Sequence, residues 1–397
     1  MRYSSLLILL WIGTITVSSI AVEPAAAKST TSTRAFDVAT IYFPSWHPDD
    51  HYSAWFGEGW NEWQLLMNAP QRYPGQTFLK PDSKPFNEAD PAHMARQVDL
   101  AADHGIDVFI FDWYWYSGVR FIEGALTDGF LKASNRNRMK YALMWANHDW
   151  KNVFPAPTTG SQQMLLPIRH SVADFQRAIR YCAQTHFNQP NYWRVKGAVY
   201  FSFFQPDVFV KQLGGVDKAR TAIDEAREYL REQGIGEMHL GAFIWQESAI
   251  ESLTRAGFNS FTSYNVTGSG KAKLPEKPLD SYDDLVENHP KFWDFLTTGT
   301  LPYCPVATVG WDPSPRWHKD TPWPPAHSEY PYGTLVQGTN PEAFGRLCQL
   351  ARQHLEKHPA PMVLLNAWNE WTEGSALLPT AEFGNAYLEE VKRAFKR

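Results

Sequence analysis

The feature that most constrains the fold is a regular alternation of apolar, β-rich runs with helical segments. Eight runs predict strands, at residues 40–46, 106–115, 140–147, 197–204, 239–246, 258–264, 305–311 and 361–368. Helical signals lie at 90–104, 118–133, 171–186, 207–233, 247–256, 282–295, 341–358 and 381–395. Runs that are hydrophobic throughout are typical of parallel strands covered on both faces. Eight strands each followed by a helix predict an α/β fold, a single-domain (β/α)8 TIM barrel.

The same alternation of strands and helices is also compatible with a doubly wound open sheet. Such a fold usually has fewer strands and a glycine-rich phosphate loop after the first one. No G-x-G-x-x-G or G-x-x-x-x-G-K-[ST] motif follows any predicted strand. The barrel is therefore favoured, with residues 48–89 and 311–340 as long βα loops over its mouth.

The N-terminal residues 1–27 have the pattern of a secretory signal peptide. Arg2 gives a positive start, residues 6–20 are apolar, and Ala25, Ala26 and Ala27 are small residues suited to cleavage. An uncleaved anchor is the alternative, although the apolar stretch is short for a membrane span. We therefore expect a signal peptide at 1–27, a catalytic domain at 28–397, a secreted or periplasmic protein, and no membrane contact after cleavage.

Composition narrows the class of partner. The formal charge is −5, from 37 Lys and Arg against 42 Asp and Glu, without basic runs, so nucleic acid is not expected as a partner. The 17 Trp, 17 Tyr and 24 Phe residues indicate aromatic platforms for sugar rings, although any single Trp is more often part of the core. The three cysteines, Cys182, Cys304 and Cys348, form no CxxC motif and leave open whether two are joined. We expect a monomer.

Metal and cofactor binding are not expected either. The segment from His47 to His51 resembles a metal cluster, but it contains Pro48 and lacks three ligands in a fixed register. We therefore predict no metal ion and no organic cofactor, and expect His47 to bind sugar hydroxyls or a backbone carbonyl.

Candidate site residues come from the ends of the predicted strands, because a barrel carries its chemistry there. Glu370 and Glu373 leave the eighth strand and are the predicted catalytic pair, since two close carboxylates can cleave a glycosidic bond. The alternative is that one pairs with an arginine such as Arg316 while the other is solvated. Predicted substrate-binding residues are His47, Glu62, Trp63, Asp112, Tyr114, Tyr116, Trp145, Asn147, His148, Trp245, Tyr264, Trp311, Asp312 and Asn369.

Two of these residues have structural alternatives of similar weight. Glu62 could line a subsite or act as a third acid, or it could cap a loop in which Trp60 and Trp63 pack. Asp312 is interpreted first as an ion-pair partner of Arg316 that holds the seventh loop, and second as a substrate clamp.

The segment Asn369-Glu370-Trp371-Thr372-Glu373-Gly374 resembles the Asn-Glu-Trp-x-Glu-Gly signature of glycoside hydrolase family 99 and its WbsX-like relatives. Further segments fit the WbsX-like branch in order and span almost the whole chain after residue 27. They are Tyr42-Phe43-Pro44 with His47-Pro48, residues 55–63, Gly105-Ile106-Asp107 with Tyr114-Trp115-Tyr116, Trp145-Ala146-Asn147, and Gly310-Trp311-Asp312 with Arg316.

The resemblance implies a (β/α)8 glycoside hydrolase without metal or organic cofactor. Characterised family 99 members are endo-acting α-mannosidases that retain configuration. One carboxylate deprotonates the sugar 2-hydroxyl, which attacks the anomeric carbon, and a second acts as general acid and then base. By motif position, Glu370 is the expected base and Glu373 the expected acid/base. Thr372, Leu378 and His148 depart from the usual pattern, which bears on mannose specificity more than on class.

Two hypotheses of different classes follow. The first is an exported glycoside hydrolase that cuts within an α-linked polysaccharide or glycan, α-mannan being one candidate. The second is a non-catalytic glycan-binding protein, or one associated with polysaccharide biosynthesis, that keeps the aromatic cleft without turnover. Retention of both Glu370 and Glu373 favours the enzyme, because a binding module has no need of two close carboxylates.

Overall fold

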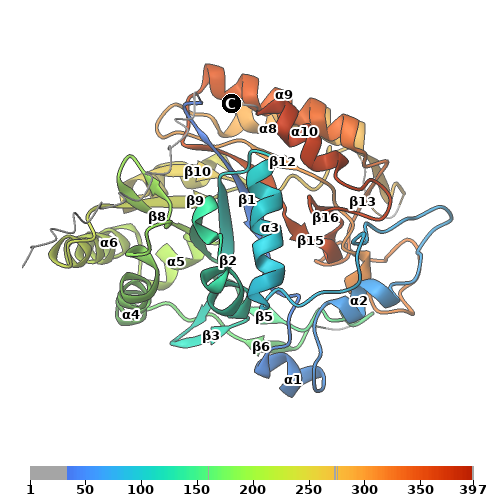
Figure 1. Cartoon of the computed structure of the whole chain (residues 1–397), viewed down its shortest axis with the longest axis horizontal. Helices are drawn as coiled ribbons and strands as arrows, with labels where there is room; N and C mark the ends of the chain where they lie inside the picture. Colours follow the sequence, from blue (N-terminus) through green and yellow to red (C-terminus); the bar gives the residue numbers. More distant parts are fainter. Residues whose placement is uncertain (1–33, 160, 272–273, 275, 396–397) are drawn as a thin grey trace, which may run out of the picture. The chain divides into compact units, whose positions relative to one another are not determined.

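Eight parallel strands form the wall of a barrel in the computed structural model, which describes residues 34–159, 161–271, 274 and 276–395 (Figure 1). They are β1 (Asp37–Tyr42), β2 (Val108–Tyr116), β4 (Lys140–Trp145), β8 (Ala198–Phe203), β9 (Met238–Phe243), β10 (Ser260–Thr262), β12 (Val306–Thr308) and β14 (Met362–Asn366). Nearly every residue in these strands is buried, which agrees with their continuous apolar sequences. The predicted signal peptide at 1–27 lies outside the described residues.

The strand order is that of a nearly closed (β/α)8 barrel. Neighbouring strands run β10-β9-β8-β4-β2-β1-β14-β12, so β1 lies between β2 and β14. Ala39 of β1 is opposite Val108 of β2, and Asp37 is opposite Met362 of β14. A single parallel bridge between Phe261 and Tyr303 joins β10 to the segment before β12. The α/β TIM-barrel prediction is confirmed, and the described residues belong to one compact unit.

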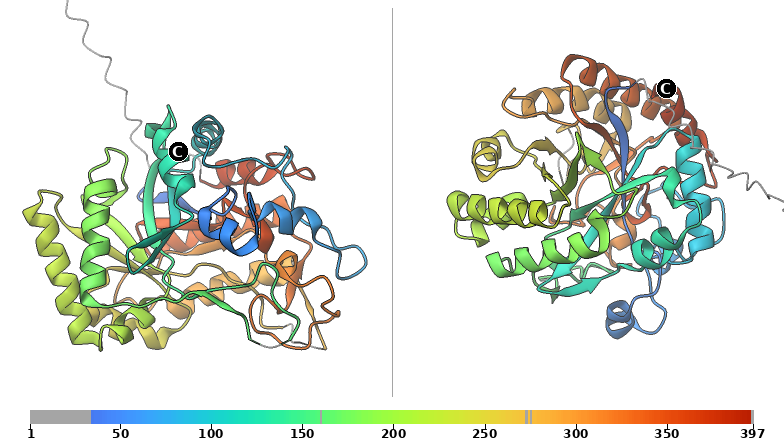
Figure 2. Two further views of the ribbon diagram at one scale, coloured as in Figure 1. Left: turned by 90° about the horizontal axis from the view of Figure 1, so that it is seen from below. Right: turned by 60° about the vertical axis from the view of Figure 1, so that its left-hand side comes forward.

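Helices surround the strands, as the right-hand view of Figure 2 shows. They are α3 (Pro91–Asp103), α4 (Val172–Cys182), α5 (Pro206–Gln212), α6 (Val216–Glu232), α7 (Ile250–Ala256), α8 (Tyr282–Leu296), α9 (Pro341–Lys357) and α10 (Ala386–Ala394). The side chain of Asn340 caps α9 by accepting from the backbone N–H of Ala343, with Pro341 in the first turn. The helix predicted at 207–233 is two helices, because Gly214 and Gly215 have positive φ angles and separate α5 from α6.

The helix predicted at 118–133 is wrong. Ser117 and Gly118 both have positive φ angles and form a two-residue turn, after which β3 (Val119–Phe121) pairs antiparallel with the end of β2. A π-helical turn η1 (Ala125–Gly129) and a 3₁₀ turn η2 (Phe130–Lys132) follow in place of a regular helix. The apolar residues of this segment are therefore buried by a hairpin and two short turns.

Short elements fill the connections. The first long loop contains α1 (Asp50–Phe56) and α2 (Trp63–Asn68). The others are β5 (Trp150–Lys151), β6 (Met164–Leu166), β7 (Arg194–Val195), β11 (Leu279–Ser281), β13 (Leu335–Gln337), β15 (Asn369–Glu370), β16 (Ser375–Ala376), η3 (Arg136–Arg138), η4 (Ala183–Phe187), η5 (Glu247–Ala249), η6 (Ser314–Arg316) and η7 (Trp371–Glu373).

Two properties of the described part bear on the sequence predictions. Cys182, Cys304 and Cys348 are buried and free, so no disulfide joins them. Among the described helices, none has the length and apolar character needed to cross a membrane.

Candidate functional site

A cavity of about 620 Å³ lies where the carboxyl ends of the barrel strands meet the loops that follow them. Its lining residues come from all eight strand ends or the loops that follow them. They are Phe43, Asp112, Tyr114, Met144, Ala146, His148, Asp149, Trp150, Lys151, Val153, Phe154, Gln162, Phe204, Gln205, Trp245, Tyr264, Asn265, Trp311, Arg316, Glu329, Tyr330, Glu370 and Glu373. The cavity therefore occupies the position at which barrels carry their chemistry.

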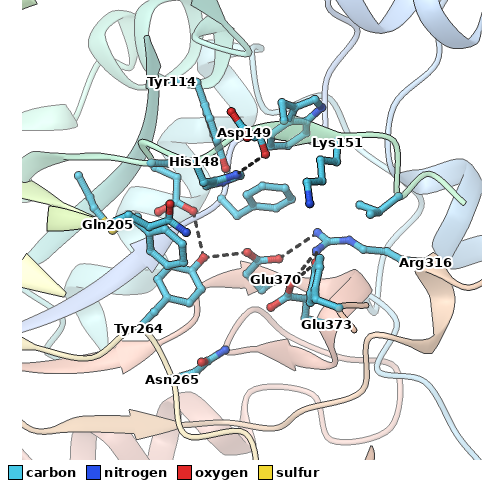
Figure 3. A pocket seen from close by; sticks show the side chains of 18 of the residues that line it. Tyr114, His148, Asp149, Lys151, Gln205, Tyr264, Asn265, Arg316, Glu370 and Glu373 are labelled. Carbon is cyan, nitrogen blue, oxygen red and sulfur yellow. Dashed lines mark hydrogen bonds and ion pairs between the residues drawn. The ribbon is translucent and has the colours of Figure 1, made fainter. Parts of the chain in front are cut away.

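Two carboxylates meet one guanidinium in this cavity (Figure 3). Nη1 of Arg316 donates to Oε1 of Glu373 at 2.6 Å, and Nη2 of Arg316 lies 3.4 Å from Oε2 of Glu370. The hydroxyl of Tyr330 also donates to Oε1 of Glu373, at 2.6 Å. Glu370 and Glu373 are 3% and 6% exposed, so neither carboxylate is solvated. The geometry differs from the alternative considered from sequence, because both glutamates contact the arginine.

A third carboxylate holds Arg316 from outside the cavity lining. Oε2 of Glu62, a fully buried residue that precedes α2, lies 3.1 Å from Nη2 of Arg316. Glu62 also accepts hydrogen bonds from Ser45 and Thr372. Thr372 therefore contacts the cluster through Glu62, while Glu62 fixes the arginine that the two cavity carboxylates share.

The cluster contains more acids than cations, and this shifts its pKa values. Burial, followed by the negative charge of Glu373, raises the pKa of Glu370 well above its ordinary value. Burial also raises the pKa of Glu373, although the charge of Arg316 opposes the shift. Burial by itself disfavours the charged guanidinium, but the neighbouring carboxylates, Glu62 first, raise the pKa of Arg316 well above its ordinary value.

Tyr264 links the cluster to a fourth acid. Its hydroxyl lies 2.8 Å from Oε1 of Glu370 and 2.9 Å from Oδ2 of Asp112, at the end of β2 (Figure 3). The other oxygen of Asp112 is buried and has no hydrogen-bond partner within the part of the chain that the structure describes. Burial raises the pKa of Asp112 well above its ordinary value.

Aromatic side chains form much of the remaining wall. Trp245 is 39% exposed and Tyr330 is 40% exposed, whereas most aromatic rings among the described residues are buried. Figure 3 shows the ammonium group of Lys151 directed into the space above Glu370 and Arg316. The cavity thus combines partly exposed rings with a charged floor.

Eight of the residues predicted from sequence line the cavity together. They are Asp112, Tyr114, His148, Trp245, Tyr264, Trp311, Glu370 and Glu373. The other eight, His47, Glu62, Trp63, Tyr116, Trp145, Asn147, Asp312 and Asn369, lie outside the lining. Trp63 instead lines a shallow groove with Trp46 and Phe86.

Two of the outlying residues hold strand ends together. The side-chain amide of Asn369 donates to the carbonyl of Phe43 and accepts from its N–H, both at 2.8 Å, which ties the loop after β14 to the end of β1. Asn147 makes the same pair of bonds to the backbone of Gln205, at 2.7 and 2.8 Å. Each asparagine therefore positions a neighbouring residue that lines the cavity.

The remaining outlying residues pack behind the wall. His47 contacts Glu88 at 3.0 Å, the hydroxyl of Tyr116 donates to the carbonyl of His148, and the indole N–H of Trp145 donates to the carbonyl of Trp115.

The predicted ion pair between Asp312 and Arg316 is not found. The carboxylate of Asp312 instead accepts from Gln76 and Ser314, and the guanidinium of Arg316 faces Glu62, Glu370 and Glu373. The sequence spacing placed the two residues on the same loop correctly but could not show which way each side chain turns.

Arg316, Tyr330 and Lys151 were not among the predicted site residues. Arg316 belongs to the segment that begins at Gly310, so its presence in that motif was a usable signal. Tyr330 lies in the middle of a long proline-rich loop, and Lys151 lies in the two-residue strand β5. No periodicity or strand end marks either of them.

A metal ion has one candidate set of ligands among the described residues. Asp294, His354 and His358 have potential ligand atoms within 4.8 Å of one another. They lie on α8 and at the end of α9, and none of them lines the cavity.

Comparisons with known proteins agree with the architecture. The family model described as "Glycosyltransferase WbsX" matches residues 38–391. The uncharacterized protein WxcX of Xanthomonas campestris pv. campestris (strain B100) is 26% identical over 377 residues, which cover 91% of this chain and 50% of that protein. The chain therefore spans about half the length of this relative.

Two solved structures share the fold. The GH99 endo-α-mannosidase from Bacteroides thetaiotaomicron superimposes with a TM-score of 0.56 and 12% identity, covering 90% of this chain and 96% of that one. A glycoside hydrolase-like protein gives a TM-score of 0.59 and 16% identity, covering 91% and 94%. At these identities the likeness establishes a fold of the glycoside hydrolase type.

Proposed function

Because the chain belongs to the family described as glycosyltransferase WbsX, we propose that it is a carbohydrate-active enzyme that hydrolyses an α-linked polysaccharide or glycan. We further propose that it cuts within the chain and retains configuration, with α-mannan as the first candidate substrate. The observation that carries the proposal is the pair of buried carboxylates, Glu370 and Glu373, on one guanidinium in an aromatic cavity.

The separation of the two carboxylates suits this chemistry. Adjacent nitrogens of Arg316 contact one oxygen of each glutamate, at 2.6 and 3.4 Å. The two contacting oxygens are therefore at most about 8 Å apart, which is below the upper limit of about 9.5 Å for pairs of glycosidase carboxylates. One substrate bond can be reached by both groups.

The two glutamates have different surroundings, which supports different roles. A base toward the sugar 2-hydroxyl must be ionised. The hydroxyl of Tyr264 donates to Glu370, and this hydrogen bond stabilises the carboxylate anion. Burial raises the pKa of both glutamates, so the division of roles follows the motif position. Arg316 and Tyr330 both contact Oε1 of Glu373, which leaves Oε2 to carry the proton that a general acid gives to the leaving oxygen.

The wall of the cavity supports a sugar substrate. The partly exposed rings of Trp245 and Tyr330 offer flat apolar faces on which the CH groups of a pyranose can stack. The polar side chains of Gln205 and Asn265 also line the cavity and can bond to hydroxyls.

The test is oligosaccharide release from α-mannans, α-glucans and bacterial exopolysaccharides by the wild type and by Glu370→Gln and Glu373→Gln. Each variant keeps the volume of the side chain but cannot exchange a proton, so each is expected to lower kcat by at least about 100-fold with glycan binding retained. Glu232→Gln is the matched control, because Glu232 is an exposed residue at the end of α6. Turnover by Glu373→Gln at the wild-type rate would contradict the assignment of Glu373 as a catalytic residue.

The family description favours a second candidate, a protein of polysaccharide biosynthesis or glycan binding without hydrolysis. Binding of one glycan by the wild type, with no product released and no transfer to an added acceptor, would support glycan binding. Transfer from an activated sugar donor to an acceptor would support biosynthesis.

We also propose that residues 1–27 are a signal peptide, so that the domain from residue 28 acts outside the cytoplasm. The measurement is the N-terminal residue of the protein recovered from the periplasm or medium of an expressing bacterium, which is expected at position 28.

A further inference from the structure

We propose that Asp112 is held as a neutral carboxylic acid and that, through the hydroxyl of Tyr264, it keeps Glu370 ionised. Asp112 is then a positioning residue for the base rather than a ligand of the substrate. This proposal rests on the proposed function for the role of Glu370, whereas the protonation state of Asp112 can be tested without any substrate.

Tyr264 has one proton for two neighbouring carboxyl groups. The oxygen of Tyr264 lies within hydrogen-bond distance of two carboxyl oxygens, 2.9 Å from Asp112 and 2.8 Å from Glu370. A phenol has one proton and donates to one of them only. The second contact is a hydrogen bond only if the other carboxyl group carries a proton and donates it to the phenol oxygen. Two ionised carboxylates around one phenol would leave one contact repulsive.

The surroundings of the two carboxyl groups differ in a way that places the extra proton on Asp112. Glu370 has a cation within reach, since Nη2 of Arg316 lies 3.4 Å from its Oε2. Asp112 has no cation beside it, and its Oδ1 is buried without a partner among the described residues. An unpaired carbonyl oxygen of a neutral acid is far less costly to bury than an unpaired carboxylate charge. The proton therefore belongs on Oδ2 of Asp112.

The surrounding charges agree with this assignment. The ionisable groups that face Asp112 are Tyr114 on its own strand, Tyr264, and the acids Glu370 and Glu373. None of these four groups is a cation. Burial and the charge of Glu373 raise the pKa of Asp112, the hydrogen bond with Tyr264 opposes them, and the net shift is well upward. Glu370 faces the same groups and, in addition, Arg316 and Glu62.

The consequence is a chain of donors that ends on the base. Asp112 donates to the oxygen of Tyr264, and Tyr264 donates to Oε1 of Glu370. The donation lowers the pKa of Glu370 relative to its value without the phenol, since a hydrogen bond to the charged form stabilises it. Glu370 is then available as a base at a lower pH than its burial alone permits.

Isotope-edited infrared spectroscopy tests the protonation state directly. Protein labelled with ¹³C in its aspartate carboxyl groups is compared with the same protein carrying Asp112→Asn, at neutral pH. We expect the difference spectrum to contain the carbonyl stretch of one protonated carboxylic acid. An Asp207→Asn control, at an exposed position in α5, is expected to lose only carboxylate bands. A difference spectrum of Asp112→Asn without a protonated carbonyl band would overturn the proposal.

Kinetics tests the consequence for Glu370. An asparagine at position 112 can still donate from its amide N–H to Tyr264, so Asp112→Asn is expected to leave the acid limb of the pH profile in place, whatever it does to kcat. Tyr264→Phe removes the donor, and its acid limb is expected to move up by about one pH unit, with activity recovering at higher pH. A larger shift in Asp112→Asn than in Tyr264→Phe would contradict the proposal.

Two outcomes separate this inference from the proposed function. If no glycan is hydrolysed, the infrared result still decides the state of Asp112. If Asp112→Asn fails to fold, the infrared spectrum of labelled Tyr264→Phe replaces it, because loss of the phenol is expected to shift the same carbonyl band. An unshifted spectrum in that variant would count against the proposal.

Discussion

At the scale of single residues, the site is organised around one arginine. Arg316 contacts Glu62, Glu370 and Glu373 and is itself 4% exposed. A planar guanidinium can meet several carboxylates at once with separate N–H groups, which an ammonium group cannot do with the same geometry. The three acids are therefore held in position by their shared partner.

Replacement of Arg316 is expected to destabilise the fold in a pH-dependent way. Arg316→Met leaves buried carboxylates without their cation, and such a loss costs about 3 to 5 kcal/mol in the free energy of unfolding near neutral pH. The loss is expected to shrink as pH falls, because protonation removes the uncompensated charges. Urea unfolding at several pH values is the measurement.

An exposed arginine provides the control for this prediction. Arg138 also contacts two carboxylates, Asp99 and Asp103, but its side chain is 42% exposed. Arg138→Met is expected to cost less than about 1 kcal/mol at any of these pH values. Equal losses for the two variants, or a loss for Arg316→Met that does not depend on pH, would show that the buried cluster does not behave as described.

The residues of the site could be predicted from sequence only in part, and the reason is physical. Strand ends are readable, and Asp112, Tyr264 and Glu370 were found because they follow apolar runs. The direction of a loop side chain is not readable, because it depends on contacts with segments far away in sequence. Tyr330 and Glu373 are 43 positions apart in the sequence, and no pattern in the residues around Tyr330 predicts their contact.

At the scale of elements, the strands were predicted more accurately than the helices. Each barrel strand overlaps a predicted run, since continuous apolar sequence is a direct consequence of burial on both faces. The segment 118–133 has enough apolar residues for a helix, but a two-residue turn at Ser117 and Gly118 starts a hairpin instead. Local turn geometry therefore overrode the helical pattern.

The turn that carries Glu373 depends on a glycine. Gly374 ends η7 with a φ angle of 68°, in the left-handed region. A Cβ atom at this position would lie 3.0 Å from the backbone nitrogen of Asp312, which itself donates to the carbonyl of Glu373 at 2.6 Å. The seventh and eighth loops are thus in contact at the residue after the predicted acid/base.

Gly374→Ala is expected to cost more than backbone strain alone. The left-handed conformation costs a non-glycine residue about 1 to 2 kcal/mol, and the contact with Asp312 adds to it. Gly384→Ala is the matched control, because Gly384 has a φ angle of 51° and open space where a Cβ atom would lie. Unfolding in urea is expected to show a loss for Gly374→Ala that exceeds the control by about 1 kcal/mol or more. Equal losses would mean that Asp312 moves aside freely.

At the scale of the whole molecule, the barrel explains how distant segments form one site. Parallel strands in a closed order bring their carboxyl ends to one rim, so Asp112 and Glu370 come within reach of the same phenol although 258 positions separate them in the sequence. The barrel could be predicted because eight apolar strands, each followed by a helix, are readable in the sequence. The short helices in the loops over the barrel mouth, such as α1 and α2, could not be predicted.

The stability of the whole barrel is expected to respond to acid through its buried histidines. Burial lowers the pKa of His289 and His170 to about 4 and that of His186 to about 3. In the unfolded chain a histidine binds its proton near pH 6.5. Between pH 6.5 and 4 the unfolded state therefore binds more protons than the folded state, so each of these groups lowers the free energy of unfolding as pH falls. Buried acids with raised pKa values, such as Asp112, act in the opposite direction.

A single histidine can be separated from these opposing contributions by substitution. Nδ1 of His289 lies 2.7 Å from the carbonyl of Leu285, and Nε2 accepts from the N–H of Thr308, so a second proton has no place. His289→Gln is expected to be less stable than the wild type at pH 7.5. This deficit is expected to shrink by up to about 1.4 kcal/mol per pH unit between pH 6.5 and 4, since only the wild type carries the proton penalty. Urea unfolding across this range measures it, with exposed His327→Gln as the control. A deficit for His289→Gln that stays constant with pH would mean that His289 is protonated without loss of its bond to Thr308.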